Sequence, residues 1–517
     1  MTGVVSRDGR EHDPASRAQQ AITLALATVL ACALVVATSG DAWRWPFQYG
    51  DDLIFDIATW HYREEKLPGE ARWIVWMWHE VFGASSPAAD FRLSLVAWCL
   101  SMALIAQRLT TGARWPSIVC AVALSANPAV LRLLQWPHTA APMMATMLMC
   151  STLLFMSFAH GRRLKLALAV ATCAAMLAFQ LFALLLIAAA LFLVTARTLR
   201  ADKWDVRDLV RNASTVVLSG VAGTIAGLLL GYAFNAAAFG HFGLDIAGWR
   251  ETNVGSGTPI ARAAMNLREV LYAASDASGH LLWPVMLTAA GTWSVLALRQ
   301  RETVRIVWLV LVLVLVLLLG VVMAPISATL LSGVPVPESR GGLTIWFAAI
   351  AMLVLLADMH AARTRVVAFS SMAVLTSTAV WLTGGMLATG SRVRLSHDVH
   401  LAVIAQDVRA ALGATGPART LVAVGVKHPF DSLGNNDEWR VRALLRSRLE
   451  PELVGSVVYC AATTCEALRG QSLPDHVEAL PGYPVTGYLS RSGDVLLLRF
   501  GRHTSSRPDM DVTHTSR

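Results

Sequence analysis

The chain has 517 residues, of which 55% are hydrophobic and 15% are charged, and its mean hydropathy is +0.52. A soluble enzyme would carry about 25% charged residues, so this composition excludes an ordinary soluble protein. The net charge of +8 does not indicate nucleic-acid binding, because the basic residues lie in short loops between apolar runs, where they act as topology signals. We therefore predict an all-α polytopic protein of the lipid bilayer, with no nucleic-acid partner.

Apolar runs long enough to cross a bilayer begin after a polar tail, residues 1–18, which carries three arginines and is expected to be cytoplasmic. The first run, 21–38, is too long for a signal-peptide core, so we expect it to be retained. About eleven membrane-spanning helices are predicted in all. After the first they lie at 92–107, 115–134, 140–159, 165–180, 181–197, 213–235, 279–298, 305–330, 343–359 and 366–389. The 165–197 region is either a tight hairpin or one long broken helix.

The connecting loops alternate in character. With the N-terminus inside, every second loop is short and basic, as cytoplasmic loops are. The opposite loops, among them 39–90 and 236–278, are longer and richer in tryptophan, glycine, proline and acidic residues. An odd number of spans then places the long loops and the C-terminal part outside the membrane of a bacterial cell.

The polar C-terminal part follows a transmembrane domain, residues 19–390. Helical periodicity appears in "LSHDVHLAVIAQDVRAAL", and the runs "TLVAVGV" and "DVLLLRF" are typical of strands. We predict a small extracytoplasmic α/β domain at 391–501 and a disordered tail at 502–517. The apolar stripe of its helix consists of Leu401, Ile404, Val408 and Leu412.

Seven cysteines are present, and five of them lie in or beside apolar runs, where cysteine is most simply a small core residue. Cys460 and Cys465 belong to the polar C-terminal part. They form a local disulfide if that part faces an oxidising compartment, or they are free thiols.

The first outer loop contains "FQYGDDLIFDIATWHYREEKLPGEARWIVWMWHE", residues 47–80. A purely structural interpretation is available: Asp51 or Asp52 caps a helix that lies in the headgroup plane, and the tryptophans form an interfacial belt. A functional interpretation is that the loop meets a lipid-linked sugar at the membrane surface. Transfer of that sugar needs a carboxylate base, groups that stabilise the departing phosphate, and aromatic faces for the sugar ring. The loop supplies all three with Asp51, Asp52, Arg63, Arg72, Trp60, Trp73 and Trp76.

Several motifs resemble the bacterial serotype-converting O-antigen glucosyltransferase family, whose members are multi-span enzymes of the GT-C class. The motifs are "GDD" after the first span, "GEARW" from Gly69 to Trp73, "AFQLF" from Ala178 to Phe182, and "PESRGGL" from Pro337 to Leu343. Similarity extends loosely over the membrane part and includes the small outer domain. One departure is that Glu70 and Ala71 separate Gly69 from Arg72, where the family has Gly-Arg directly before the tryptophan.

This resemblance implies a GT-C-like hexosyltransferase that uses a polyprenyl-phosphate-linked sugar as donor. The acceptor would be a cell-envelope glycan, such as the O-antigen of lipopolysaccharide, on the outer face of the inner membrane. Transfer would invert the anomeric centre, with Asp51 or Asp52 as the base and glucose as the first candidate sugar.

Three further residues are candidates for substrate binding. His138, in an outer turn, is either a phosphate donor or an interfacial anchor, and Gln180 is an intramembrane polar group with a packing or substrate role. Arg340 faces outside next to Glu338 and either binds phosphate or pairs with that acid. No cofactor is predicted; divalent-metal assistance would need carboxylates such as Asp51 or Asp52, and no zinc-type cluster or EF-hand loop supports it.

The main rival function is a transporter or flippase for a lipid-linked envelope precursor. Such proteins carry ionisable residues at mid-membrane depth. In this sequence the spans are almost free of charge and the acidic residues gather outside, which favours surface chemistry. A non-catalytic partner in envelope assembly is a third alternative, and it would not need the two aspartates.

Overall fold

A computed structural model of the chain contains two compact units, Met1–Ser391 and Arg392–Arg517, and each is described here by itself. The long helix α18, Ala362–Thr415, contributes to both. The structure describes residues 14–48, 63, 67–83, 85–110, 113–158, 161–200, 206–245, 268, 272, 275–276, 278–288, 291, 295, 342–359, 362–425, 429–430, 438–450, 452–460 and 479–501.

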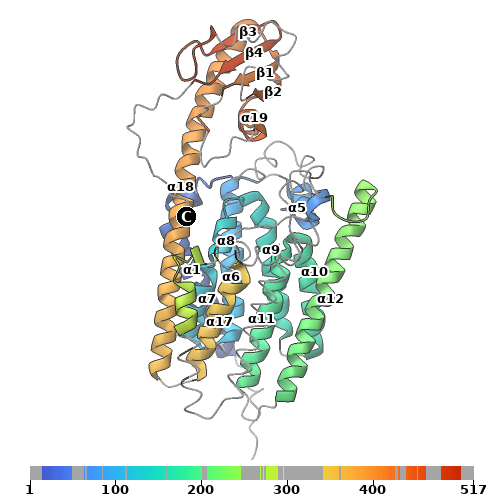
Figure 1. The fold of residues 1–517 in the computed structure, drawn as a ribbon, viewed down its shortest axis with the longest axis vertical. Helices are drawn as coiled ribbons and strands as arrows, with labels where there is room; N and C mark the ends of the chain where they lie inside the picture. The colour runs from blue at the N-terminus through green and yellow to red at the C-terminus, as the bar shows by residue number, and fades with distance from the viewer. Residues whose placement is uncertain are drawn as a thin grey trace, which may run out of the picture. The chain divides into compact units, whose positions relative to one another are not determined.

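The first unit is a bundle of helices (Figure 1). Six helices of the described chain have segments long and apolar enough to cross a membrane, so a multi-pass membrane protein is confirmed at that level. These segments are Arg17–Thr38, Pro87–Leu109, Pro137–Ser157, Gln180–Thr198, Arg207–Phe239 and Arg365–Thr415. The predicted total of about eleven stays a prediction, because all of 305–330 and most of 279–298 lie outside the described residues.

The helices of this unit, in chain order, follow the predicted spans closely. They are α1 (Pro14–Thr38), η2 (Gly40–Trp43), α4 (Leu67–Glu70), α5 (Trp73–Phe82), α6 (Pro87–Leu109), α7 (Arg114–Ser125), α8 (Pro128–Leu133), α9 (Pro137–Ser157), α10 (Gly161–Ala178), α11 (Gln180–Leu199), α12 (Val206–Phe239), α17 (Leu343–Met359) and α18.

One predicted span, 115–134, is two helices. The break falls at Asn127, whose side chain accepts a hydrogen bond from the amide of Ala129 and so caps α8. Pro128, the first residue of α8, has no N–H with which to continue α7. A local capping signal therefore interrupts a run that is apolar throughout.

The 165–197 region is a tight hairpin. Phe179 alone separates α10 from α11 and has an extended backbone, with φ −160° and ψ 111°. The two helices pack against each other. Near the far end of α11, Arg197 donates to the carbonyl of Phe158, just before α10 begins, which places the end of α11 beside the start of α10. A single broken helix is thereby excluded.

The close packing of α10 and α12 depends on glycine. A Cβ atom at Gly223 of α12 would lie 2.1 Å from the carbonyl oxygen of Ala169 on α10. No side chain fits at that distance, so glycine allows the two backbones to approach each other. This contact holds α12 against the hairpin whose turn lies beside the candidate site.

The second unit contains a four-stranded sheet with the order β2-β1-β4-β3. β1 (Ala418–Val424) pairs in parallel with β2 (Val454–Cys460) and with β4 (Val495–Arg499), while β3 (Leu489–Ser492) pairs antiparallel with β4. One helix, α19 (Glu438–Arg446), lies between β1 and β2 in the chain and contacts β2. The two runs predicted as strands form β1 and β4, which confirms them.

The predicted helical stripe of this unit is buried in α18, and its four residues are at most 2% exposed. Cys460, at the end of β2, is disulfide-bonded, whereas Cys32, Cys99, Cys120, Cys150 and Cys173 are free thiols. Cys465 lies outside the described residues.

Candidate functional site

Helix α5 is the element on which the predicted site residues converge. It starts after Arg72 and ends at Gly83, whose φ of +74° suits glycine. Trp73, Val75 and His79 are buried, whereas Val81 and Phe82 are exposed. The predicted apolar helix "RWIVWMWHEVF" is therefore present, with one side packed against the bundle, where α5 contacts α9 and α10.

Arg72 and Gln180 meet at the residue that distinguishes this chain from the family pattern. Arg72 Nη1 lies 3.1 Å from Glu70 Oε2, and both side chains are at most 15% exposed. Gln180 Nε2 donates to the backbone carbonyl of Glu70 at 2.8 Å, and the Arg72 guanidinium lies 5.4 Å from the ring centroid of Phe179. The hairpin turn thus holds Arg72, and Glu70 offsets its charge.

Trp73 anchors the start of α5 to α12. Its indole N–H donates to Asn235 Oδ1 at 3.0 Å, and its ring contacts Phe234 and Phe239 edge-on or tilted. Asn235 is fully buried and also donates to the carbonyls of Pro68 and Gly243. These contacts use the polar atom of the indole inside the protein, so Trp73 is a structural anchor of the site.

Trp76 and Arg63 lie on the more accessible side. The rings of Trp73 and Trp76 meet edge to face with centroids 5.7 Å apart, an arrangement that aromatic pairs favour. The guanidinium of Arg63, an exposed residue, lies 5.9 Å from the Trp76 ring centroid. This pair combines an aromatic face with a mobile positive charge, which suits a phosphorylated sugar.

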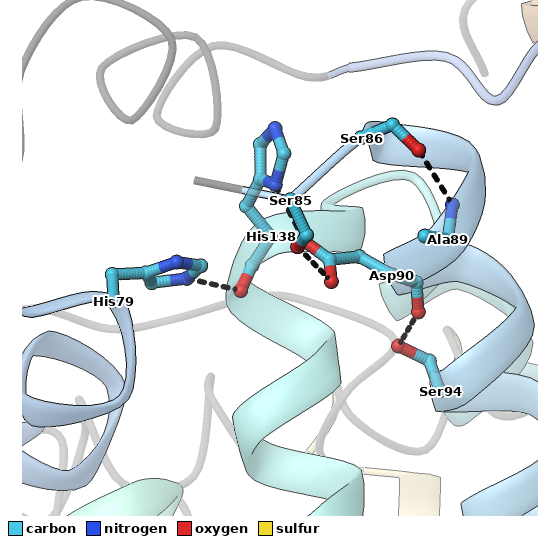
Figure 2. A network of polar contacts seen from close by, with 7 residues as sticks. All are labelled: His79, Ser85, Ser86, Ala89, Asp90, Ser94 and His138. Atoms are coloured by element: carbon cyan, nitrogen blue, oxygen red, sulfur yellow. Dashed lines mark hydrogen bonds and ion pairs between the residues drawn. The ribbon is translucent and has the colours of Figure 1, made fainter. Parts of the chain in front are cut away.

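His138, the second residue of α9, is fully buried and belongs to a polar network (Figure 2). Its Nδ1 lies 2.6 Å from Asp90 Oδ2, and the hydroxyl of Ser85 donates to Asp90 Oδ1. His79 of α5 donates from Nε2 to the backbone carbonyl of His138 at 2.8 Å. Neither an isolated interfacial anchor nor a surface phosphate donor describes this histidine, because its ring is inside the protein and paired with a carboxylate.

Burial lowers the pKa of His79 below the usual value of 6.5. Its neighbours act in both directions: the hydrogen bond to the His138 carbonyl and the Asp90 charge raise the pKa, and the His138 ring lowers it. The neutral ring is favoured, because an imidazolium here would have to leave water.

Sequence reasoning missed His79 and Asp90. Asp90 is an acidic residue in the first turn of an apolar span, and such residues are rare enough in membrane helices to be examined for a partner. The general statement that the spans are almost free of charge hid this one. His79 gave no comparable signal, because it follows three tryptophans in a segment that is otherwise interfacial in character.

The remaining predicted site residues, Asp51, Asp52 and Arg340, lie outside the described residues. The described part of the chain contains no group of three or more His, Cys, Asp or Glu side chains that could hold a metal ion. Compared with protein-family models, with curated proteins and with solved structures, the chain matches none.

Proposed function

We propose that this protein is a membrane glycosyltransferase that moves a sugar, with glucose the first candidate, from a polyprenyl-phosphate donor to a cell-envelope glycan on the outer face of the bacterial inner membrane. The observation that supports it best is the convergence around α5: Arg72, Trp73, Trp76 and Gln180 lie together although they come from two distant segments. Cations, aromatic faces and amides together are what a sugar phosphate requires.

The chemical step is a single displacement. The hydroxyl oxygen of the acceptor forms a bond to the anomeric carbon, the bond from that carbon to the phosphate oxygen breaks, and Asp51 or Asp52 takes the hydroxyl proton. The departing polyprenyl phosphate gains negative charge, which Arg63 and Arg72 would stabilise. Attack opposite to the leaving group inverts the anomeric centre.

The C-terminal unit supports an extracytoplasmic position for the same reaction. Its Cys460 is disulfide-bonded, and disulfides persist mainly in oxidising compartments such as the periplasm. This agrees with the topology expected from the basic loops, in which the long first loop and the C-terminal unit share the outer side.

The test uses the double substitution of Asp51 and Asp52 by Asn in the full-length protein. We expect sugar transfer from a synthetic polyprenyl-phosphate sugar in proteoliposomes to fall by about 10³-fold or more, since the base is lost. The matched control is Asp41→Asn, an exposed carboxylate of the same outer segment, which should transfer normally. Loss of one sugar from the envelope polysaccharide of a deletion strain would identify the product. Transfer by the double variant at the wild-type rate would contradict the proposal.

A transporter or flippase is the second candidate, and the buried Asp90–His138 pair favours it, since such pairs mark proton and ion pathways in membranes. However, Asp90 is the fourth residue of α6 and His138 the second of α9, whereas transport sites lie near the bilayer midplane. In proteoliposomes without acceptor, a flippase would move a labelled lipid-linked sugar between leaflets. A transferase would leave it in place until acceptor is added.

A further inference from the structure

We propose that His79, His138 and Asp90 are positioning residues: they hold the C-terminal half of α5 on α9 and thereby keep Arg72 and Trp76 at the substrate site. This inference rests on the proposed glycosyl transfer for its kinetic consequence, while the docking of α5 can be measured without any activity.

A proline in α9 creates the docking point. In a regular helix the carbonyl of residue 138 accepts the N–H of residue 142, but residue 142 is proline and has no N–H. The His138 carbonyl therefore lacks its helical donor, and the His79 imidazole supplies one at 2.8 Å. Pro142 thus makes the bond between α9 and α5 necessary, since a buried carbonyl left without a donor destabilises the fold.

The Asp90–His138 pair fixes the orientation of this carbonyl. Because the carboxylate of Asp90 only accepts, His138 Nδ1 must carry the proton that lies between them. Ser85 donates to the other carboxylate oxygen, so both oxygens of a buried carboxylate are satisfied. The pair ties the first turn of α9 to the first turn of α6, and these are the turns on which the end of α5 rests (Figure 2).

Helix α5 is held at both ends and exposed between them. Trp73 anchors its start to Asn235 of α12, and His79 anchors its end to α9. Its outward side presents Met77, Val81 and Phe82, which are at least 39% exposed. A helix of ten residues is too short to be stable by itself, so its position depends on these two anchors.

The experiment compares two pairs of variants in the full-length protein, in nanodiscs. His79→Gln keeps a donor at the place of Nε2, and His79→Phe removes it; likewise His138→Asn keeps a donor at the place of Nδ1, and His138→Phe removes it. We expect the amides of α5 to exchange hydrogen about tenfold faster in both Phe variants, with α6 and α9 unchanged, and both conservative variants to resemble the wild type. The KM for the lipid-linked donor should rise about tenfold in the Phe variants, with a smaller change in kcat.

Two results would overturn the inference: unchanged exchange in α5 of the Phe variants, or faster exchange over the whole bundle, which indicates a general structural role. Faster exchange in α5 together with an unchanged donor KM would show that α5 docks as described but does not position the site. If the wild type transfers no sugar while α5 still loosens in the Phe variants, the proposed function fails and the docking stands.

Discussion

The two ends of the helical bundle use charged side chains in different ways. At the end where α6, α9, α11 and α17 finish, arginines donate to backbone carbonyls at or just beyond helix C-termini, where the helix dipole favours a cation. At the opposite end, beside α5, charges occur in buried pairs such as Asp90–His138 and Glu70–Arg72. The carbonyl contacts at the first end are Arg108 to Phe155, Arg197 to Phe158, Arg200 to Leu109 and Arg365 to Ala357.

This difference separates a structural end from a chemical one. A single arginine on a helix terminus satisfies carbonyls, and its flexible side chain can still reach the headgroups. A buried carboxylate–imidazole pair is weak evidence for stability, since apolar residues of the same volume often stabilise a protein more. The α5 end therefore carries a feature that packing does not require, which is why the candidate site is placed there.

The largest effect is expected from Asp90→Ala. It leaves His138 Nδ1–H buried without its acceptor, so the free energy of unfolding should fall by about 3–5 kcal/mol. Thermal unfolding in detergent measures this. The matched control is Asp208→Ala, because Asp208 pairs with Arg211 in an exposed position at the arginine end, and it should cost about 0.5 kcal/mol or less. Equal effects of the two substitutions would remove the distinction between the ends.

Trp73→Phe should come next. It keeps most of the buried ring but removes the donor to Asn235, which should lower the free energy of unfolding by about 1–3 kcal/mol and raise the donor KM. Trp115→Phe is the control, since Trp115 is 67% exposed at the arginine end. A loss of stability in the control as large as in Trp73→Phe would mean that indoles matter here by area alone.

Arg108→Met tests the arginine end. Arg108 donates to the Phe155 carbonyl and lies 4.1 Å from the centroid of its ring. Losing both contacts should cost about 1 kcal/mol, with no change in sugar transfer. Arg114→Met, at the start of α7, should be neutral, because Arg114 is exposed. A large loss of transfer in Arg108→Met would place chemistry at this end and contradict the comparison.

The smallest effect is a pH dependence of α5 docking. Because the pKa of His79 is below 6.5 in the folded protein, the undocked state binds more protons, so docking is strongest above about pH 6.5 and weakens as the pH falls below that value. Val75→Cys, at a position that is 0% exposed, would react with a thiol reagent only when α5 lifts. Val81→Cys, at a position 74% exposed, corrects for the reagent's own pH dependence. The effect should disappear in His79→Gln, and a dependence that persists there has another origin.

Much of the architecture was predictable because its signals are local. Continuous apolar runs located the described helices, and alternation between turns located β1 and β4. The hairpin at Phe179 could be placed but not distinguished from a broken helix, because the backbone conformation of one residue decides between them. The break before Pro128 had a sequence signal, the Asn-Pro dipeptide, inside a run otherwise predicted as one span.

The candidate site was predicted only in part. Arg72, Trp73, Trp76 and Gln180 were recognised by residue type, and the structure brings them together. That Arg72 pairs with Glu70, and that Trp73 spends its indole N–H on Asn235, was not predictable, because a motif does not show which neighbour takes a donor. His138 was weighed as a lone side chain, and its carboxylate partner changes its meaning.

By itself the sequence determined that this chain is a helical membrane protein with a small α/β unit, because length, hydropathy and periodicity are properties of neighbouring residues. Tertiary structure alone decided the pairings: Asp90 with His138, 48 residues apart, and Trp73 with Asn235, 162 apart. Hydrogen bonds between such distant residues form only after the helices have packed. Pro142 stands between the two cases, since the sequence shows which carbonyl loses its donor, and the fold shows that His79 replaces it.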